Sequence, residues 1–139
     1  MARIVLDTRA FVSAALEAEG KAARVLELVC DGEVELAVSP AIMAEYETVL
    51  RRKKFGLSAQ TAREVVGGLR LTAVEVAPTE TLYLCRDSGD DKFLECAQAS
   101  GAAFLVAASP RRFRPGLKVA RAVSPAAFLR EIEEPRVKT

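Results

Sequence analysis

The segment Ile4-Val5-Leu6-Asp7-Thr8-Arg9-Ala10-Phe11-Val12-Ser13-Ala14-Ala15-Leu16 combines a short apolar run, an abrupt acid and a helical pattern. Residues 4–6 are too few for a core helix and include β-branched side chains, which is typical of a buried strand. Apolar residues then recur at helical spacing from Ala10 to Ala15. The segment therefore predicts a strand that carries Asp7 at its carboxyl end and turns at once into a helix.

Asp7 has two interpretations. Ligands and chemistry gather at the carboxyl ends of strands in open α/β sheets, which favours a functional acid. Asp is also a preferred N-cap residue, so a purely structural role at the start of the helix is the alternative. The choice between them depends on whether other acids reach the same place.

The length of 139 residues suits one domain with a sizeable core. We expect a single domain over 1–133 and a flexible tail over 134–139. Half of the residues are apolar and 28% are charged, which is typical of a globular protein. No apolar run is long enough for a membrane span or a signal peptide, so we expect a cytoplasmic protein with no membrane partner.

The counts of cysteine and histidine restrict the chemistry. Three cysteines without a CxxC spacing suit a reducing compartment, with the thiols as small core residues. The chain has no histidine, which excludes Ser-His-Asp and Cys-His catalysis and removes the usual zinc ligands apart from the cysteines. Hydrolytic chemistry would have to use carboxylates, and these imply Mg²⁺ or Mn²⁺.

Charge is unevenly distributed although the net charge is only +1. Residues 1–107 hold 12 Lys/Arg and 16 Asp/Glu, whereas residues 108–139 hold 8 Lys/Arg and 3 Glu. A basic tract beside an acidic crevice is compatible with nucleic acid passing a metal site. A solvated surface without a partner explains the same charges.

Strand and helix patterns alternate along the rest of the chain. They predict an α/β three-layer sandwich, with a central parallel sheet of four to five strands and helices on both faces. Ser39-Pro40 and Ser124-Pro125 each combine a preferred cap with a preferred first helical residue. The further expected strands are 33–38, 72–76 at a sheet edge, 103–107 in the middle of the sheet and 118–123; the further expected helices cover 22–29, 40–50 with 51–54 in its last turn, 58–69, and 90 or 91 to 100, and 109–116 is expected to be a basic loop.

Acids follow several of these elements. Asp7 follows the first strand, Glu45 lies a little over one turn into the helix after Ser39-Pro40, and Asp90 and Asp91 open a later helix. Glu95 lies four residues after Asp91, on the same helical face. Carboxylates brought close together repel one another unless a cation lies between them. Taken singly, Glu45 could be an ordinary exposed residue, and Asp90 and Asp91 could be caps.

The ordered set of these motifs resembles a PIN domain, and more closely the VapC-like toxin components of toxin–antitoxin systems. The resemblance covers nearly the whole chain, from Arg3 to about Leu129. It rests on Leu6-Asp7-Thr8, Ser39-Pro40, Glu45-Tyr46, Val49-Leu50, Arg86-Asp87-Ser88-Gly89-Asp90-Asp91-Lys92-Phe93-Leu94-Glu95-Cys96-Ala97 and residues 102–106.

This resemblance implies a parallel sheet and a metal-dependent ribonuclease. The acids matching Asp7, Glu45 and Asp91 would hold Mg²⁺ or Mn²⁺ for the cleavage of single-stranded RNA. The implied partners are a small antitoxin protein and a second copy of the chain, as a homodimer.

The sequence departs from the family pattern at two positions. Family members usually carry Asn two residues after the first acid, where this chain has Arg9. They usually carry Thr-Gly-Asp, with a second Asp soon after, following the central strand. This chain has Ala107-Ala108-Ser109-Pro110-Arg111 there, so Ser109 replaces the fourth acid. Arg9 is expected to reach the carboxylates and take the place of a cation.

Two hypotheses follow. In the first, the chain is a PIN-type endoribonuclease in which Asp7, Glu45 and Asp91 are catalytic and bind the metal together with Asp90. In the second, it is a PIN-like domain that binds RNA or a protein partner without cutting. In the first hypothesis the supporting residues are Glu95, Ser109 and Arg9, and the residues that hold the RNA backbone are Arg111, Arg112 and Arg114. A phosphoacceptor receiver domain is a distant third interpretation, because that fold carries paired acids after its first strand and this chain does not.

Overall fold

A parallel sheet forms the centre of the computed structural model, which describes residues 1–133; the tail predicted over 134–139 lies outside them. The strands are β1 (Arg3–Leu6), β2 (Glu35–Val38), β3 (Val74–Glu75), β4 (Phe104–Val106) and β5 (Arg121–Val123). Their order in the sheet is β3-β2-β1-β4-β5, and every pairing is parallel. The predicted parallel sheet is confirmed.

The first strand is the central one. Ile4, Val5 and Leu6 are completely buried, because β1 has a strand on each edge and helices on both faces. The strand predicted over 72–76 is an edge strand, and β4 is enclosed between β1 and β5, as the continuous apolar pattern of the sequence indicates.

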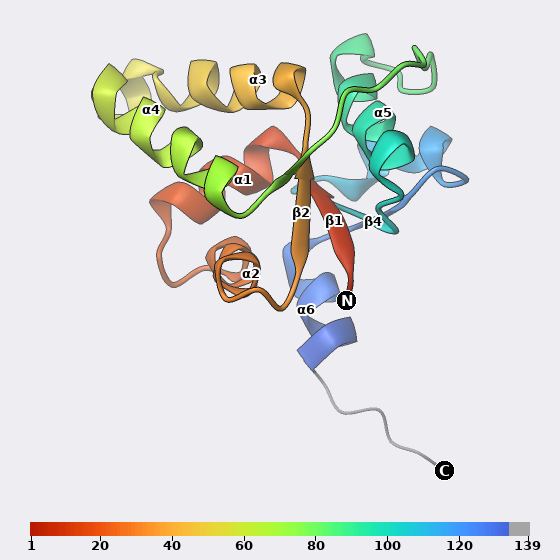
Figure 1. The fold of residues 1–139 in the computed structure, drawn as a ribbon, viewed down its shortest axis with the longest axis horizontal. Coiled ribbons are helices and arrows are strands. Elements are labelled where there is room, and N and C mark those ends of the chain that lie inside the picture. Colours follow the sequence, from red (N-terminus) through yellow and green to blue (C-terminus); the bar gives the residue numbers. More distant parts are fainter. Residues whose placement is uncertain (134–139) are drawn as a thin grey trace.

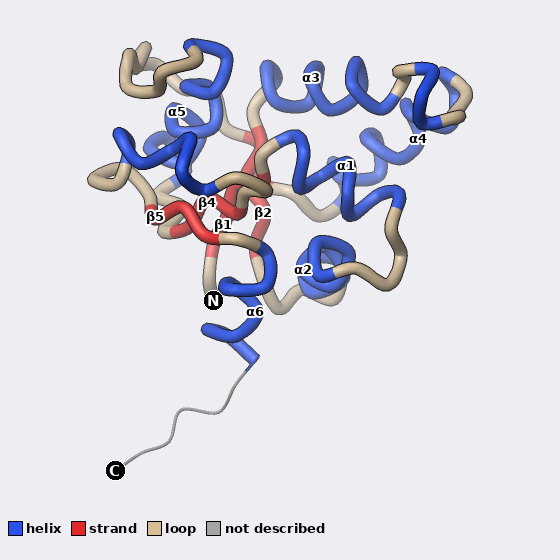
Figure 2. Tube along the Cα trace, turned by 180° about the vertical axis from the view of Figure 1, so that it is seen from behind, coloured by secondary structure: helices blue, strands red, loops and turns tan. Residues whose placement is uncertain are grey.

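Helices cover both faces of the sheet (Figures 1 and 2), which confirms the three-layer prediction. Figure 1 shows α5 (Asp91–Ser100) on one side, packed on β1, β2 and β4, and α1 (Thr8–Leu16) and α2 (Lys21–Cys30) on the other. The last helix, α6 (Pro125–Glu133), packs against α2. The remaining pair, α3 (Pro40–Leu50) and α4 (Ala59–Gly68), connects β2 to β3.

Three helices begin where the sequence predicts. Asp7 caps α1 by accepting a hydrogen bond from the backbone N–H of Ala10. Ser39 does the same for α3, and Ser124 accepts from the N–H of Ala127 in the first turn of α6. These caps satisfy N–H groups that have no partner within their helix, so they fix the exit of the chain from each strand.

Two local predictions are wrong. The α3 helix ends at Leu50, because Arg52 is extended and residues 53–55 form a separate 3₁₀ turn. The expected basic loop over 109–116 is a 3₁₀ helix, Pro110–Gly116, held in place by the buried ring of Phe113 against Phe93. Asp90 is at the N-cap position of α5, one of the two positions expected from the sequence, but its side chain makes no capping hydrogen bond.

Tyr46 joins α3 to the end of the central strand. Its ring is completely buried and stacks on Phe11, with 4.1 Å between the ring centroids and 10° between the planes. Its hydroxyl donates a hydrogen bond of 2.6 Å to the carbonyl oxygen of Leu6. This contact fixes α3 beside the residue that precedes Asp7, and so it sets the position of the neighbouring Glu45.

Among residues 1–133, no helix has the length and apolar character needed to cross a membrane.

We expect Tyr46→Phe to lower the free energy of unfolding by about 1–2 kcal/mol, because the buried carbonyl of Leu6 loses its donor. Urea denaturation measures the change. Tyr83→Phe is the matched control, since Tyr83 is 85% exposed, and we expect its stability to be unchanged. Equal stability of the two variants would contradict this assignment.

Candidate active site

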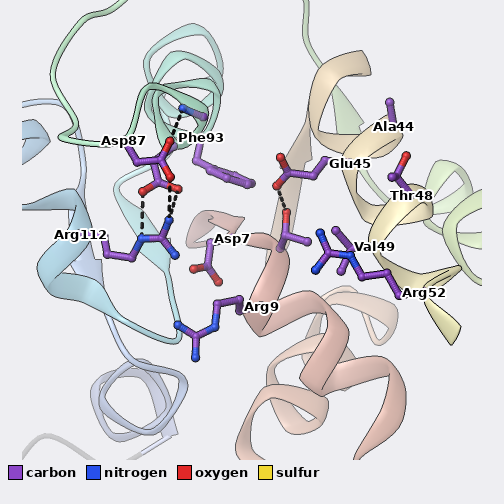
Figure 3. A pocket seen from close by; sticks show the side chains of 13 residues that line it. Asp7, Arg9, Ala44, Glu45, Thr48, Val49, Arg52, Asp87, Phe93 and Arg112 are labelled. Atoms are coloured by element: carbon purple, nitrogen blue, oxygen red, sulfur yellow. Dashed lines mark hydrogen bonds and ion pairs between the residues drawn. The ribbon is translucent and has the colours of Figure 1, made fainter. Parts of the chain in front are cut away.

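A crevice of about 520 Å³ opens at the carboxyl end of β1, between α3 and the start of α5. Figure 3 shows Asp7 near its centre, with Arg112 on one side and Glu45 and Arg52 on the other. Four elements contribute to the wall: the β1–α1 junction, α3, the start of α5 and the 3₁₀ helix Pro110–Gly116. The lining residues are Asp7, Thr8, Arg9, Ala44, Glu45, Thr48, Val49, Arg52, Asp87, Gly89, Asp90, Phe93 and Arg112.

Asp7 is a buried carboxylate whose two oxygens differ. The residue is only 4% exposed. Its Oδ1 accepts hydrogen bonds from the backbone N–H groups of Ala10 at 2.8 Å and Ala108 at 3.3 Å. Among residues 1–133, Oδ2 has no hydrogen-bond or ion-pair partner. Burial raises the pKa of this carboxyl, and the two N–H bonds and the charges of Arg9 and Arg112 oppose the rise. Asp7 is thus both a helix cap and an acid of the crevice.

Glu45 is held by a hydroxyl and an ammonium group. Thr8 donates a short hydrogen bond to Oε2, and Lys92 contacts Oε1 at 2.6 Å. The same Lys92 ammonium donates to the carbonyl oxygen of Gly89 at 2.6 Å. Thr8 and Lys92 fix the Glu45 carboxylate at the crevice, and the Lys92 ammonium neutralises its charge.

Asp90 is paired with Arg112 by two parallel hydrogen bonds. Arg112 Nε lies 2.9 Å from Oδ2 and Nη2 lies 3.0 Å from Oδ1, and Nη2 is also 3.5 Å from Asp87. Burial raises the pKa of Asp90, and the guanidinium opposes the rise. Such a bidentate pair has a fixed geometry, so Asp90 and Arg112 act as one unit on this wall.

Asp91 and Glu95 face elsewhere. Asp91 Oδ1 accepts from the backbone N–H groups of Leu84 at 3.1 Å and Cys85 at 2.8 Å. Glu95 Oε2 accepts from the N–H of Leu82 at 2.9 Å. Neither residue lines the crevice. The structure places Asp90 there, whereas the two acids of the common helical face hold the segment before α5.

The two positions that depart from the family pattern contact each other. Arg9 donates a hydrogen bond of 3.2 Å to the hydroxyl of Ser109, across 100 positions of the sequence. Arg9 borders the crevice, as expected, but the hydrogen bond that its guanidinium makes is to this neutral group. Its charge still acts on Asp7, whose pKa it lowers.

The predicted RNA-binding arginines divide between two hollows. Arg112 lines the crevice, whereas Arg111 and Arg114 line an adjoining hollow of about 480 Å³ that also contains Arg112. Thr8, Arg52 and Lys92 were not predicted as site residues from the sequence: Thr8 and Arg52 line the crevice, and Lys92 binds Glu45. The sequence did hold a signal for Lys92, which follows Asp91 in the helix. Because one helical position rotates a side chain by about 100°, Lys92 and Asp91 point to different sides of α5.

Two of the three cysteines, Cys85 and Cys96, are protonated at neutral pH. Burial raises the pKa of the Cys85 and Cys96 thiols to about 12. A thiolate nucleophile is therefore excluded for these two residues, and the reactive groups of the crevice are its oxygen donors and cations.

A profile of the PIN domain matches residues 3–108, a span that includes β1 to β4 and every acid of the crevice. The chain belongs to the PIN domain family. One relative is the "Uncharacterized protein MJ1680" of Methanocaldococcus jannaschii, which is 24% identical over 106 residues, covering 74% of this chain and 68% of that protein. PIN domains are generally nucleases that use divalent metal ions.

The oxygen donors of this PIN domain fit a hard cation in kind. Asp7 Oδ2 is an accessible carboxylate oxygen of a residue that is only 4% exposed, it has no positive partner among residues 1–133, and a cation would balance its charge. Glu45 and Asp90 already hold Lys92 and Arg112. Within residues 1–133, no three acids are grouped closely enough to hold an ion, so the acids are brought to one crevice but are not assembled around one point.

The raised pKa of Asp7 predicts how the free energy of unfolding changes with pH. Folding raises the pKa of the Asp7 carboxyl, so the folded state binds its proton more tightly than the unfolded state does. The stability gained from this proton is fully present below the unfolded pKa of 3.8 and is lost as pH rises through the folded pKa. We expect Asp7→Asn to gain stability over the natural protein as pH increases above 3.8. Urea denaturation of both proteins from pH 3.5 to 7 tests this, and a stability difference that is constant with pH would contradict it.

Proposed function

We propose that this PIN domain is a metal-dependent endoribonuclease that cleaves single-stranded RNA. The observation that supports this best is the free Oδ2 of buried Asp7, which faces a crevice shared with Glu45 and Asp90. We further propose, on the resemblance to VapC-like toxins, that the chain is the toxin of a toxin–antitoxin pair, acts as a homodimer and is held by a small antitoxin in the cytoplasm.

Asp7, Glu45 and Asp90 are the residues that would hold Mg²⁺ or Mn²⁺ from the crevice, and Asp91 supports them by anchoring the segment before α5. A bound ion of this kind activates water as a nucleophile and stabilises charge on the scissile phosphate. Among the three, Asp7 would hold such an ion without first losing an ion pair, because its Oδ2 has no cationic partner among residues 1–133, whereas Glu45 and Asp90 are paired.

The other residues bind and orient. Thr8 holds Glu45 through its hydroxyl, which keeps this carboxylate at the mouth of the crevice. Arg111, Arg112 and Arg114 supply guanidinium groups at one end, where they would contact phosphates of the RNA backbone. Release of Lys92 and Arg112 from their acids would leave both cations available to the phosphates.

We expect Asp7→Asn to reduce cleavage of single-stranded RNA in Mn²⁺ by at least about 100-fold, because several kcal/mol of charge stabilisation would be lost. The rate is measured on a labelled RNA by gel electrophoresis, with the folded state checked by circular dichroism. Asp31→Asn is the matched control, since Asp31 is exposed at the end of α2. Cleavage at the natural rate by Asp7→Asn would overturn the proposal.

A second candidate function is RNA binding without cleavage. It is favoured by the resident cations of the crevice: Lys92 on Glu45, Arg112 on Asp90, and Arg9 close enough to Asp7 to lower its pKa. Arg9 and Ser109 replace an amide and an acid of the family pattern, so both changes make the site less negative and weaken attraction for a divalent ion.

The double variant Arg9→Asn, Ser109→Asp tests how much these positions matter for the metal. We expect it to bind Mn²⁺ more tightly by roughly tenfold or more, because a cation is removed near Asp7 and a carboxylate is added beside it. Isothermal titration calorimetry measures both affinities.

The variant Arg63→Asn, Ser58→Asp makes the same charge change on α4, away from the crevice, and Asp still caps that helix. It should leave Mn²⁺ affinity unchanged. Tight Mn²⁺ binding by the natural protein, with no gain in the first variant, would exclude the second candidate function.

A further inference from the structure

A second hollow of about 460 Å³ continues from the crevice along α1 and the end of α3. Arg9, Val49 and Arg52 line both hollows, so the two are adjacent and share a wall. Beyond this wall the second hollow is bordered by Lys54, Phe55 and Glu17. Figure 3 shows Arg52 on the opposite side of Asp7 from Arg112, which places this hollow at the other end from Arg111 and Arg114.

The charge of the second hollow is largely unpaired. In residues 1–133, neither Arg52 nor Lys54 forms an ion pair, and the hydrogen bond made by Arg9 is to the neutral hydroxyl of Ser109. Glu17 is the acid among its lining residues, and it accepts a hydrogen bond from Ser13. The crevice differs, since Lys92 and Arg112 already neutralise two of its acids.

An aromatic ring lies beside these cations. The 3₁₀ turn Lys53–Phe55 carries it, and the Lys54 ammonium is 5.1 Å from the centroid of the Phe55 ring. Gly56 ends the turn with φ +69°, a left-handed conformation that favours glycine. The turn therefore has a defined geometry, and Phe55 packs partly against the core. Free cations beside an aromatic ring are the combination that binds the backbone and bases of single strands.

We propose that the second hollow binds the nucleotide that follows the crevice along a single strand of RNA. Arg9, Arg52 and Lys54 hold its phosphate, and the ring of Phe55 supports its base. This subsite rests on the proposed function only in its substrate, single-stranded RNA, and does not require cleavage. With Arg111 and Arg114 at the opposite end, it gives the strand a path across the acids with cations on both sides.

The test is binding of a fluorescein-labelled single-stranded RNA in EDTA, measured by fluorescence anisotropy over a range of salt concentrations. We expect Arg52→Gln, Lys54→Gln to weaken binding roughly tenfold and to reduce the slope of log K against log salt by about 0.7, the value for one phosphate contact on a single strand. Phe55→Leu should weaken binding at least about fivefold through lost stacking.

The matched control is Arg63→Gln, Arg70→Gln, which removes the same charge from exposed positions on the far part of α4 and the turn after it. Its affinity should stay within about twofold of the natural protein. Equal weakening by both double variants, no weakening by either, or no RNA binding by the natural protein would overturn the subsite. Thermal unfolding verifies the fold of Phe55→Leu, and the double variant decides the matter if that substitution unfolds the chain.

Measurements of cleavage and of binding distinguish failure of the subsite from failure of the proposed nuclease function. If substitutions at Arg52 and Lys54 remove the subsite, Asp7-dependent cleavage in Mn²⁺ persists but is slower at low RNA concentration. Failure of the proposed function gives no cleavage by the natural protein, while the effect of Arg52 and Lys54 on binding in EDTA persists.

Discussion

The burial of one carboxylate, Asp7, at the end of the central strand is the constraint on which the site depends. A buried charge is costly unless hydrogen bonds or a cation compensate it. Two backbone N–H groups, from Ala10 and Ala108, compensate one oxygen, and the other oxygen is left facing the crevice. Because one of these donors belongs to α1 and the other follows β4, the same carboxylate links the two segments that adjoin the site.

The remaining acids of the crevice are balanced by side chains of the same chain. Lys92 neutralises Glu45, and Arg112 neutralises Asp90 with two parallel bonds. This arrangement removes the repulsion that three neighbouring carboxylates would otherwise suffer. In the proposed function, a metal ion entering the crevice would have to compete with these cations, whereas an RNA backbone would offer them phosphates as alternative partners. The proposal therefore implies that metal and RNA would support each other's binding, since the phosphates would free the carboxylates.

Much of the fold follows from local sequence. Ser39-Pro40 and Ser124-Pro125 begin helices where expected, and the apolar run around Leu105 lies inside the sheet. Errors occur where long-range packing decides. The 3₁₀ helix over 110–116 depends on Phe113 reaching Phe93, a contact between residues far apart in the chain, and local polarity alone suggested a loop.

By itself, the sequence determined that Asp7 ends the first strand and that Glu45 lies just over a turn into a helix, because strand ends and caps depend on neighbouring residues. Only the tertiary structure decided which acid of the Asp90-Asp91 pair lines the crevice. The N–H groups of Leu84 and Cys85 bind Asp91, and Arg112, from a distant segment, binds Asp90. Likewise, the contact between Arg9 and Ser109 joins positions 100 residues apart, and it exists because β1 and β4 are paired in the sheet.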